Sequence, residues 1–282
     1  MAVVCAYKIF TNFIVYITHY RDGIWLNKQP KDHPSTIKKR CISVFFMTLI
    51  SPFFILIFGN DETKNKASLW ELMGIRSEGF LASLFLPLIL TAILFLGPIV
   101  QSHQNSSYAH TLQMYCDPRY WYSSAQNPIW WRNQVVAPFS EEFTFRACML
   151  PLLLQCMTPG KVIFVAPLFF GVAHLHHAVE RMSLRMDLTS VVIISCFQFC
   201  YTSIFGFYSA FLFIRTGHFL PLFAVHAFCN HMGLPELKEV FSKPEAIRNK
   251  LLAAHVAGLV AWYFLLYPLT EPTYYSNTLY VL

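Results

Sequence analysis

"VVAPFSEEFTFRACMLPLLL", residues 135–154, is the stretch that decides the fold. Most of it has the composition of a helix that crosses a membrane, yet it contains Glu141, Glu142 and Arg146. Each charged side chain at the centre of such a helix costs about 2.5–3.5 kcal/mol on insertion scales. Charges are retained inside spans mainly where they line a functional site, so this stretch predicts one.

The composition of the whole chain is that of a membrane protein. Its 282 residues are 55% hydrophobic and only 13% charged, whereas soluble domains carry about 25% charged residues. Apolar runs long enough to span a bilayer lie near residues 3–20, 41–59, 79–100, 134–157, 161–177, 189–214, 217–233 and 251–269. We therefore expect an all-α polytopic membrane bundle of about eight transmembrane helices. The length suits a single domain over residues 1–282.

The basic residues orient this bundle. Fourteen Lys and Arg residues lie in loops 21–40, 101–133, 178–188 and 234–250, against five on the opposite side. The positive-inside rule predicts that the first group of loops faces the cytosol and that both termini are lumenal. Because the charges sit in short loops, without a basic helix or a stacking platform, we expect no nucleic-acid partner.

This orientation makes a prediction about glycosylation. Asn105-Ser106-Ser107 has the pattern of a glycosylation site, but it lies in loop 101–133. On the cytosolic side it never meets the lumenal enzymes that attach glycans, so Asn105 should be unmodified. Endoglycosidase treatment of the protein from eukaryotic cells should leave its electrophoretic mobility unchanged. A mobility shift that Asn105→Gln abolishes would reverse the orientation.

Three groups of polar residues interrupt the apolar runs. In the first, "EEFTFR", Glu142 and Arg146 are four residues apart and share a helix face, so they can form an ion pair. Glu141 points about 100° away from that pair. A partly desolvated carboxylate without a cationic partner is suited to act as a general base.

The other two groups contain histidine. Phe170 and His174, in "FFGVAHLHH", are four residues apart, as are His226 and Asn230 in "HAFCNHMG". The loop charges place all three polar groups near the cytosolic ends of their helices. We therefore expect them at one depth, around a cavity open to the cytosolic side, since charged groups inside a membrane line such cavities.

A carboxylate, a histidine and two hydrogen-bond donors are the parts of a hydrolytic site. Glu141 and His174 could deprotonate a water, and His226 and Asn230 could donate to the tetrahedral oxyanion. Two alternatives remain open. The polar groups could hold helices together or bind an ion in a non-enzymatic scaffold or transporter. Alternatively, Glu141, His174 and His226 could be the ligands of a zinc hydrolase.

The loop before the first polar group is rich in aromatic residues. It carries "YWYSSAQNPIWWRNQ", residues 120–134. Tyr and Trp concentrate at the headgroup level of a bilayer, so we expect this segment to anchor at the interface. The alternative is that it lines the route by which a lipid enters the site.

Together, the three polar groups resemble the motifs of a known family. EExxxR at Glu141–Arg146, FxxxH at Phe170–His174 and HxxxN at His226–Asn230 are similar to those of the type II CAAX prenyl endopeptidases. These are the Ras-converting proteases of the endoplasmic reticulum, within a superfamily that includes bacteriocin-processing membrane proteins. The phrases "RNQVVAPFSEEFTFRACMLPLL", "LFFGVAHLHH" and "FGFYSAFLFIRTGHFLPLFAVHAFCNHMG" resemble the eukaryotic branch.

The resemblance implies a function and a location. The chain would be an integral-membrane protease of the endoplasmic reticulum, with a motif-bearing core over about residues 130–235. Its partners would be membrane lipids and farnesylated or geranylgeranylated CAAX proteins such as Ras-type small GTPases. It would remove the C-terminal tripeptide from these proteins, and the resemblance implies neither a metal nor another cofactor.

Roles for individual residues also follow from the resemblance, which implies catalysis by a glutamate-activated water. Glu141 and His174 would be the catalytic pair that activates the water. His226 and Asn230 would donate hydrogen bonds to the oxyanion. The supporting residues would be Glu142, Arg146 and Phe170.

Overall fold

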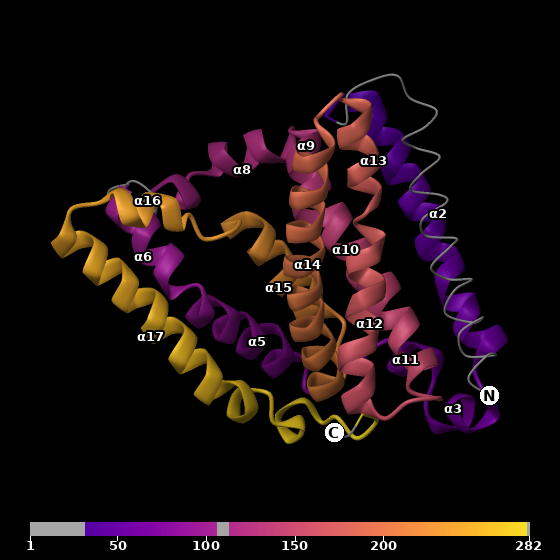
Figure 1. Cartoon of the computed structure of the whole chain (residues 1–282). Helices are drawn as coiled ribbons and strands as arrows, with labels where there is room; N and C mark the ends of the chain where they lie inside the picture. The colour runs from indigo at the N-terminus through magenta and orange to yellow at the C-terminus, as the bar shows by residue number, and fades with distance from the viewer. Residues whose placement is uncertain (1–31, 106–112, 281–282) are drawn as a thin grey trace.

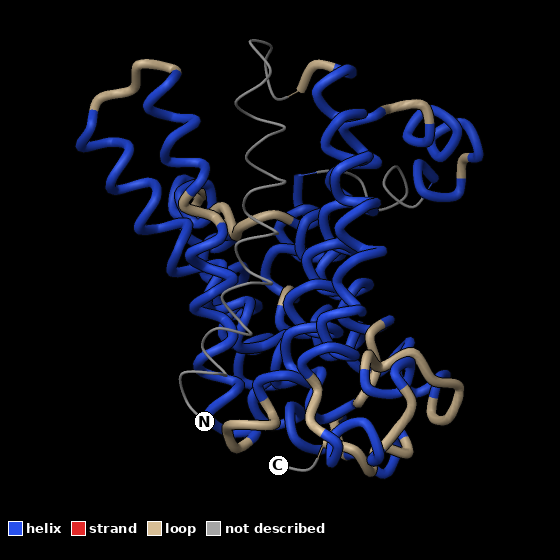
Figure 2. Tube along the Cα trace, turned by 90° about the vertical axis from the view of Figure 1, so that its right-hand side faces the viewer, coloured by secondary structure: helices blue, strands red, loops and turns tan. Residues whose placement is uncertain are grey.

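The computed structural model of the chain describes residues 32–105 and 113–280, and its regular elements there are all helical. Figure 2 shows helices along most of the trace, joined by short loops. The expected run 3–20 lies outside the described residues. The short helices are α3 (Asp61–Lys66), α4 (Leu69–Leu72), α8 (Pro118–Ala125), α9 (Pro128–Trp131), α16 (Leu237–Ser242) and the 3₁₀ turn η3 (Pro272–Tyr275).

Four helices of the described chain are long and apolar enough to cross a membrane by themselves. They are α2 (Pro34–Phe58), the continuous pair α12 (Pro159–Ala173) and α13 (His176–Ser183), α14 (Leu188–Thr216) and α17 (Glu245–Leu269). Large apolar side chains such as Phe45, Phe197 and Phe264 are exposed on them, as a lipid environment requires. The all-α polytopic membrane bundle is thus confirmed.

A further span is bent. α5 (Phe80–Leu94) and α6 (Leu96–Asn105) pass the same test together, but they turn by 66° at their junction. Pro98 explains the break, because proline has no N–H to donate to the carbonyl of Leu94. Gly97 lets α17 approach the bend, since a Cβ at this position would clash with the ring of His255.

The two runs that carry the first and third polar groups are irregular or short. Run 134–157 becomes one helical path through the π-helical η1 (Arg132–Val136), α10 (Ala137–Glu142), the π-helical η2 (Phe143–Cys148) and α11 (Met149–Leu153). Run 217–233 becomes α15 (Leu220–Met232), which has only 13 residues. Neither is among the four or five spans found in the described chain, so a total of eight transmembrane helices stays a prediction.

The helices form two groups, and the irregular segment runs through one of them. In Figure 1, α12 and α14 stand nearly upright and α2 slants beside them to the right, whereas α17 leans to the opposite side together with α5 and α6. α10 and α11 lie between α2 and the upright helices α12 and α14, and α15 lies between this group and the group of α5, α6 and α17. The upper end in this view holds α8, α9, α13 and α16, and the lower end holds α3 and the C-terminus. The described parts of the loops that the charge count grouped together therefore lie at the same end of the bundle.

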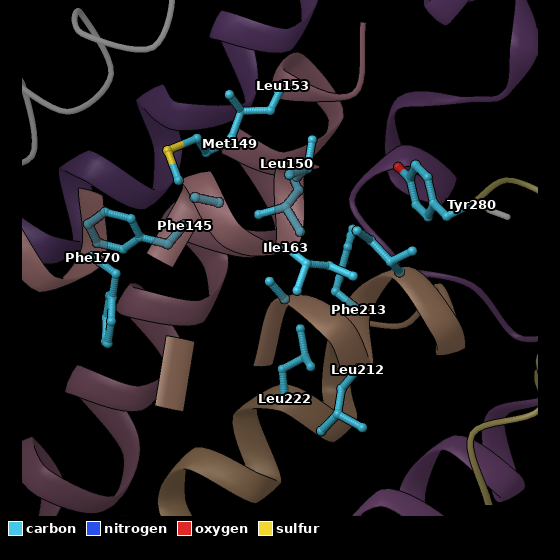
Figure 3. Close-up of a cluster of buried hydrophobic side chains, with 14 of the residues drawn as sticks. Phe145, Met149, Leu150, Leu153, Ile163, Phe170, Leu212, Phe213, Leu222 and Tyr280 are labelled. Carbon is cyan, nitrogen blue, oxygen red and sulfur yellow. The ribbon is translucent and has the colours of Figure 1, made fainter. Parts of the chain in front are cut away.

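A hydrophobic core holds the irregular segment in place. Its buried side chains come from α2, η2, α11, α12, α14, α15 and the C-terminal segment. Figure 3 labels ten of them: Phe145, Met149, Leu150, Leu153, Ile163, Phe170, Leu212, Phe213, Leu222 and Tyr280. Lipid tails are as apolar as these side chains, so close packing rather than withdrawal from water holds such helices together. This packing surrounds η2 from several sides and positions the charged residues beside it.

Candidate active site

Glu142 is the centre of a buried polar network. Its carboxylate accepts hydrogen bonds from Arg146 Nη1 at 3.1 Å, His226 Nδ1 at 2.7 Å and Ser209 Oγ at 2.6 Å. The side chains of Glu142 and Arg146 are 0% and 2% exposed. Buried charges are tolerated when they are paired and hydrogen-bonded, and this network meets that condition. The ion pair predicted from the four-residue spacing is confirmed.

The same network orients His226. An ionised carboxylate only accepts hydrogen bonds, so the hydrogen of the 2.7 Å contact is carried by His226 Nδ1. The other ring nitrogen, Nε2, faces the second carboxylate and lies 3.9 Å from Glu141 Oε2. Because Nδ1 already carries a proton, Nε2 can donate to a further group only when the ring carries both protons.

His174 is oriented by the main chain. Its Nδ1 lies 2.8 Å from the carbonyl oxygen of Phe170, one turn earlier in α12. A carbonyl oxygen only accepts, so Nδ1 carries the proton, and Nε2 of the neutral ring has a free lone pair. This nitrogen also lies 3.9 Å from Glu141 Oε2. The four-residue spacing thus matters partly because it places the main-chain carbonyl of Phe170 where it orients the ring of His174.

Glu141 faces both histidines without bonding to either directly. A separation of 3.9 Å is too long for a direct hydrogen bond, and contacts of this length are commonly bridged by a water. The side chains of Glu141 and His174 are 15% and 16% exposed, so solvent can reach them, in contrast to Glu142. The structure therefore brings together a partly hydrated carboxylate and two imidazole nitrogens, which are groups that can bind and deprotonate a water.

Phe170 joins the three motifs. Its ring lies beneath the Arg146 guanidinium, whose Cζ is 4.4 Å from the ring centroid, at a distance typical of a cation–π contact. The ring also packs edge-on against His174, with centroids 4.7 Å apart, and lies 6.4 Å from the ring of His226. Because Phe170 is buried, it fixes the relative positions of side chains from η2, α12 and α15.

Asn230 lies at the rim of the site, one turn after His226 in α15. Its Nδ2 donates to the main-chain carbonyl of Asn133 in η1 at 2.9 Å. An amide nitrogen carries two hydrogens, and among the described residues only this one acceptor, the carbonyl of Asn133, receives a bond from it. The residue is exposed, so the second hydrogen is available to a bound substrate.

Two residues near the site were missed by the sequence analysis, Ser209 and Phe205 of α14. Ser209 donates to Glu142, and the ring of Phe205 lies 4.6 Å from the ring of His226. A signal for this face of α14 was present, because small or polar residues recur along it three or four positions apart, as membrane helix interfaces often show. These residues are all buried: Ser195, Gln198, Thr202, Gly206 and Ser209.

A cavity of about 570 Å³ lies beside α15, the helix that carries His226 and Asn230. α6, α8, α9 and α15 contribute to its largely apolar and aromatic wall, which includes Val100, Tyr120, Trp121, Trp130, Ala227 and Phe228. Ala227 directly follows His226 in α15, so one helix contributes both to the cavity wall and to the site. Trp121 and Trp130 of the aromatic loop form part of the wall of this cavity. This position agrees both with an anchor at the interface and with the lining of a route for lipid entry.

The zinc alternative would use the same three side chains, Glu141, His174 and His226. Among residues 32–105 and 113–280, no three His, Cys, Asp or Glu side chains are arranged to hold one metal ion. Zinc would require each donor atom at about 2.0–2.2 Å from a common centre. Metal analysis of the purified protein distinguishes a zinc site from a glutamate-activated water at these three residues.

The sequence was compared with known families and proteins. Residues 123–232, which contain all three motifs, match the family described as Type II CAAX prenyl endopeptidase Rce1-like. The chain is 42% identical over 258 residues to CAAX prenyl protease 2 of Homo sapiens, an alignment that covers 90% of this chain and 78% of the relative. No solved structure matches the chain with significance.

More distant organisms have relatives of the same name. The chain is 38% identical over 261 residues to CAAX prenyl protease 2 of Arabidopsis thaliana, which covers 85% of this chain and 80% of the relative. It is 30% identical over 263 residues to that of Saccharomyces cerevisiae, with 80% and 81% covered. The similarity therefore extends well beyond the motifs, into the flanking helices.

Proposed function

Because this chain belongs to the type II CAAX prenyl endopeptidases, a family of membrane proteases, we propose that it removes the C-terminal tripeptide from farnesylated or geranylgeranylated CAAX proteins such as Ras-type small GTPases. The reaction takes place in the membrane of the endoplasmic reticulum, with the site on the cytosolic side. One observation carries the mechanism: Glu141 Oε2 lies 3.9 Å from Nε2 of both His174 and His226.

In this mechanism the nucleophile is a water held between Glu141 and His174. Glu141 accepts one proton of the water while the oxygen of the water attacks the carbonyl carbon of the prenylated cysteine. His174 orients the water, because the free lone pair on its Nε2 accepts the second hydrogen. The carbonyl bond becomes a single bond, and negative charge develops on its oxygen.

His226 and Asn230 stabilise that charge. His226 donates from Nε2 when its ring carries both protons, and the carboxylate of Glu142 then balances the charge through the contact at Nδ1. Donors that are already in position cost no reorganisation during the reaction. When the C–N bond breaks, Glu141 returns its proton to the leaving nitrogen, so that the tripeptide leaves as an amine and Glu141 is again a carboxylate.

The prenyl group occupies the cavity beside α15. Ligand pockets typically enclose about 300–1,000 Å³ and are mainly apolar, and this cavity of about 570 Å³ fits that description. Before it binds, the prenyl chain partitions into the bilayer, which brings the attached cysteine to the depth of the site. The partly exposed position of Glu141 serves this arrangement, because the base must meet both water and a lipid-anchored substrate.

Val100→Phe should make the enzyme discriminate against the longer prenyl chain. Val100 of α6 lines the cavity, so the larger side chain fills part of the space that the prenyl chain would occupy. The position lies outside the three catalytic motifs. Each CH₂ group that loses its place costs about 0.8 kcal/mol, so kcat/KM for a geranylgeranylated peptide should fall roughly 10-fold relative to a farnesylated one. Steady-state cleavage of both peptides measures this ratio.

The matched control is Val256→Phe, which makes the same change on α17 at a side chain that is 61% exposed. It should leave the ratio between the two peptides unchanged. An unchanged ratio in Val100→Phe as well would show that the prenyl chain binds elsewhere.

Cleavage by the purified protein tests the function itself. A farnesylated CAAX peptide should release its C-terminal tripeptide, detected by mass spectrometry, and the same peptide without the prenyl group should be a much poorer substrate. CAAX prenyl protease 2 of Homo sapiens serves as the positive control. Failure to release the tripeptide under conditions in which the human protein is active would contradict the proposal.

A further inference from the structure

Arg181 of α13 is a cation near the site that no carboxylate of the described chain neutralises. Its Nη1 donates to Ser195 Oγ at 3.1 Å and its Nη2 to Gln198 Oε1 at 2.6 Å, and both acceptors are neutral groups of α14. The adjacent carboxylate, Glu180, is instead within 3.1 Å of His177. A guanidinium has five N–H donors in a fork that fits a carboxylate, so Arg181 retains both charge and donors for a ligand.

α14 gives the distance from Arg181 to the catalytic groups. Gln198 holds Arg181, and Phe205, seven residues later in the same helix, packs against His226 with ring centroids 4.6 Å apart. Seven residues of α-helix rise about 10.5 Å. Arg181 is therefore about 10 Å from the level of His226 along α14, toward the end of the bundle where α13 lies (Figure 1).

Tyr201 lies on α14 between these two levels. Its phenol interacts with Gln198 and is in electrostatic range of both Glu141 and Arg181. Tyr201 is thus one side chain of α14 that lies near both Arg181 and the carboxylate of Glu141.

The leaving tripeptide of a CAAX substrate has the matching length and charge. Its free α-carboxylate lies three residues beyond the scissile carbonyl, and three extended residues span about 10–11 Å. We infer that Arg181 binds this α-carboxylate, with the tripeptide extended along α14 from His226 toward α13. Guanidinium–carboxylate pairs form strong, often bidentate hydrogen bonds. The inference rests on the proposed function and adds to it the group that recognises the free C-terminus.

The test compares two substrates that differ only at the C-terminus. A farnesylated CAAX peptide with a free carboxylate and the same peptide with a C-terminal amide are cleaved by the wild type and by Arg181→Gln, Arg181→Lys and Arg185→Gln. The last variant is the matched control, because it removes the same charge from an exposed side chain four residues away. For each combination, kcat and KM are measured separately.

The wild type should favour the free acid over the amide roughly 10- to 100-fold in kcat/KM, the range expected for hydrogen bonds to a charged group. Arg181→Gln should remove this preference, mainly by raising KM for the acid. Arg181→Lys should keep part of it, and Arg185→Gln should keep all of it.

A role restricted to holding α13 against α14 gives a different result. Arg181→Gln would then slow both peptides by the same factor and preserve the preference for the acid, which would overturn the inference. A wild type that cleaves both peptides equally well would overturn it too, while leaving the proposed function intact. A wild type that cleaves neither peptide would instead refute the proposed function, and the inference with it.

Discussion

Glu141→Gln should lower kcat for a farnesylated CAAX peptide by about 10²–10⁴-fold, the contribution typical of a general base, while substrate binding is retained. Glutamine has nearly the same shape as glutamate, but it cannot accept the proton of the attacking water. Glu141 is not a member of the buried network around Glu142, so the variant should fold normally. Single-turnover cleavage gives the rate, and binding of the labelled peptide is measured separately.

Two other variants make this result specific. Glu78→Gln, at an exposed carboxylate near the opposite end of the bundle, should leave kcat unchanged. Glu142→Gln should instead act largely through stability, because breaking a buried ion pair leaves Arg146 uncompensated. Near-normal turnover by Glu141→Gln would mean that another group is the base.

Asn230→Ala should lower kcat by about 10²–10³-fold with little change in KM. Removal of one oxyanion donor typically has an effect of this size, and a donor that acts mainly in the transition state affects kcat rather than apparent affinity. Asn230 is exposed and bonds only to the carbonyl of Asn133 among the described residues, so the fold should tolerate its loss. Steady-state kinetics with the farnesylated peptide measures both constants.

His226→Ala distinguishes the mechanism with a glutamate-activated water from the zinc mechanism. It should lose a similar factor in kcat, together with some thermal stability, because Glu142 loses a hydrogen-bond donor. If His226 were a zinc ligand, this variant would lose bound metal and Asn230→Ala would have only a mild effect. A mild Asn230→Ala variant would therefore contradict the oxyanion role.

Contacts within a single helix, and the common depth of the three polar groups, could be predicted from the sequence. The spacing of Glu142 and Arg146 predicted an ion pair, which the structure confirms at 3.1 Å. Loop charges and the positions of the motifs predicted that Glu141, His174 and His226 lie at one depth, and the structure places Glu141 within 3.9 Å of both histidines. Both predictions rest on helix geometry and the positive-inside rule, which need no knowledge of how helices pack.

Contacts between distant helices could not be predicted in this way. His226 and Ser209 donate to Glu142 from residues 84 and 67 positions away, and no periodicity within one segment specifies which helices meet. The sequence predicted that His226 donates to the oxyanion, but it did not predict the contact of His226 Nδ1 with Glu142. This contact means that Nε2 can serve an oxyanion only in the doubly protonated ring.

The course of the fourth and seventh apolar runs was also beyond the sequence analysis. Hydropathy predicted a spanning helix for each. The fourth run instead contains two π-helical stretches, and the seventh run has only 13 helical residues. π-Helical turns are frequent at functional sites, and η2 begins at Phe143, directly after the two glutamates. Such local rearrangements depend on the packing around Arg146 and Phe170 rather than on composition.

The most direct test of a glutamate-activated water is the activity of metal-free protein. The purified protein is dialysed against a chelator, its metal content is quantified by elemental analysis, and kcat for a farnesylated CAAX peptide is measured before and after zinc is added back. The mechanism built on Glu141, His174, His226 and Asn230 predicts full activity without stoichiometric metal and no gain on adding zinc. Loss of activity on chelation, restored by one equivalent of zinc, would contradict it.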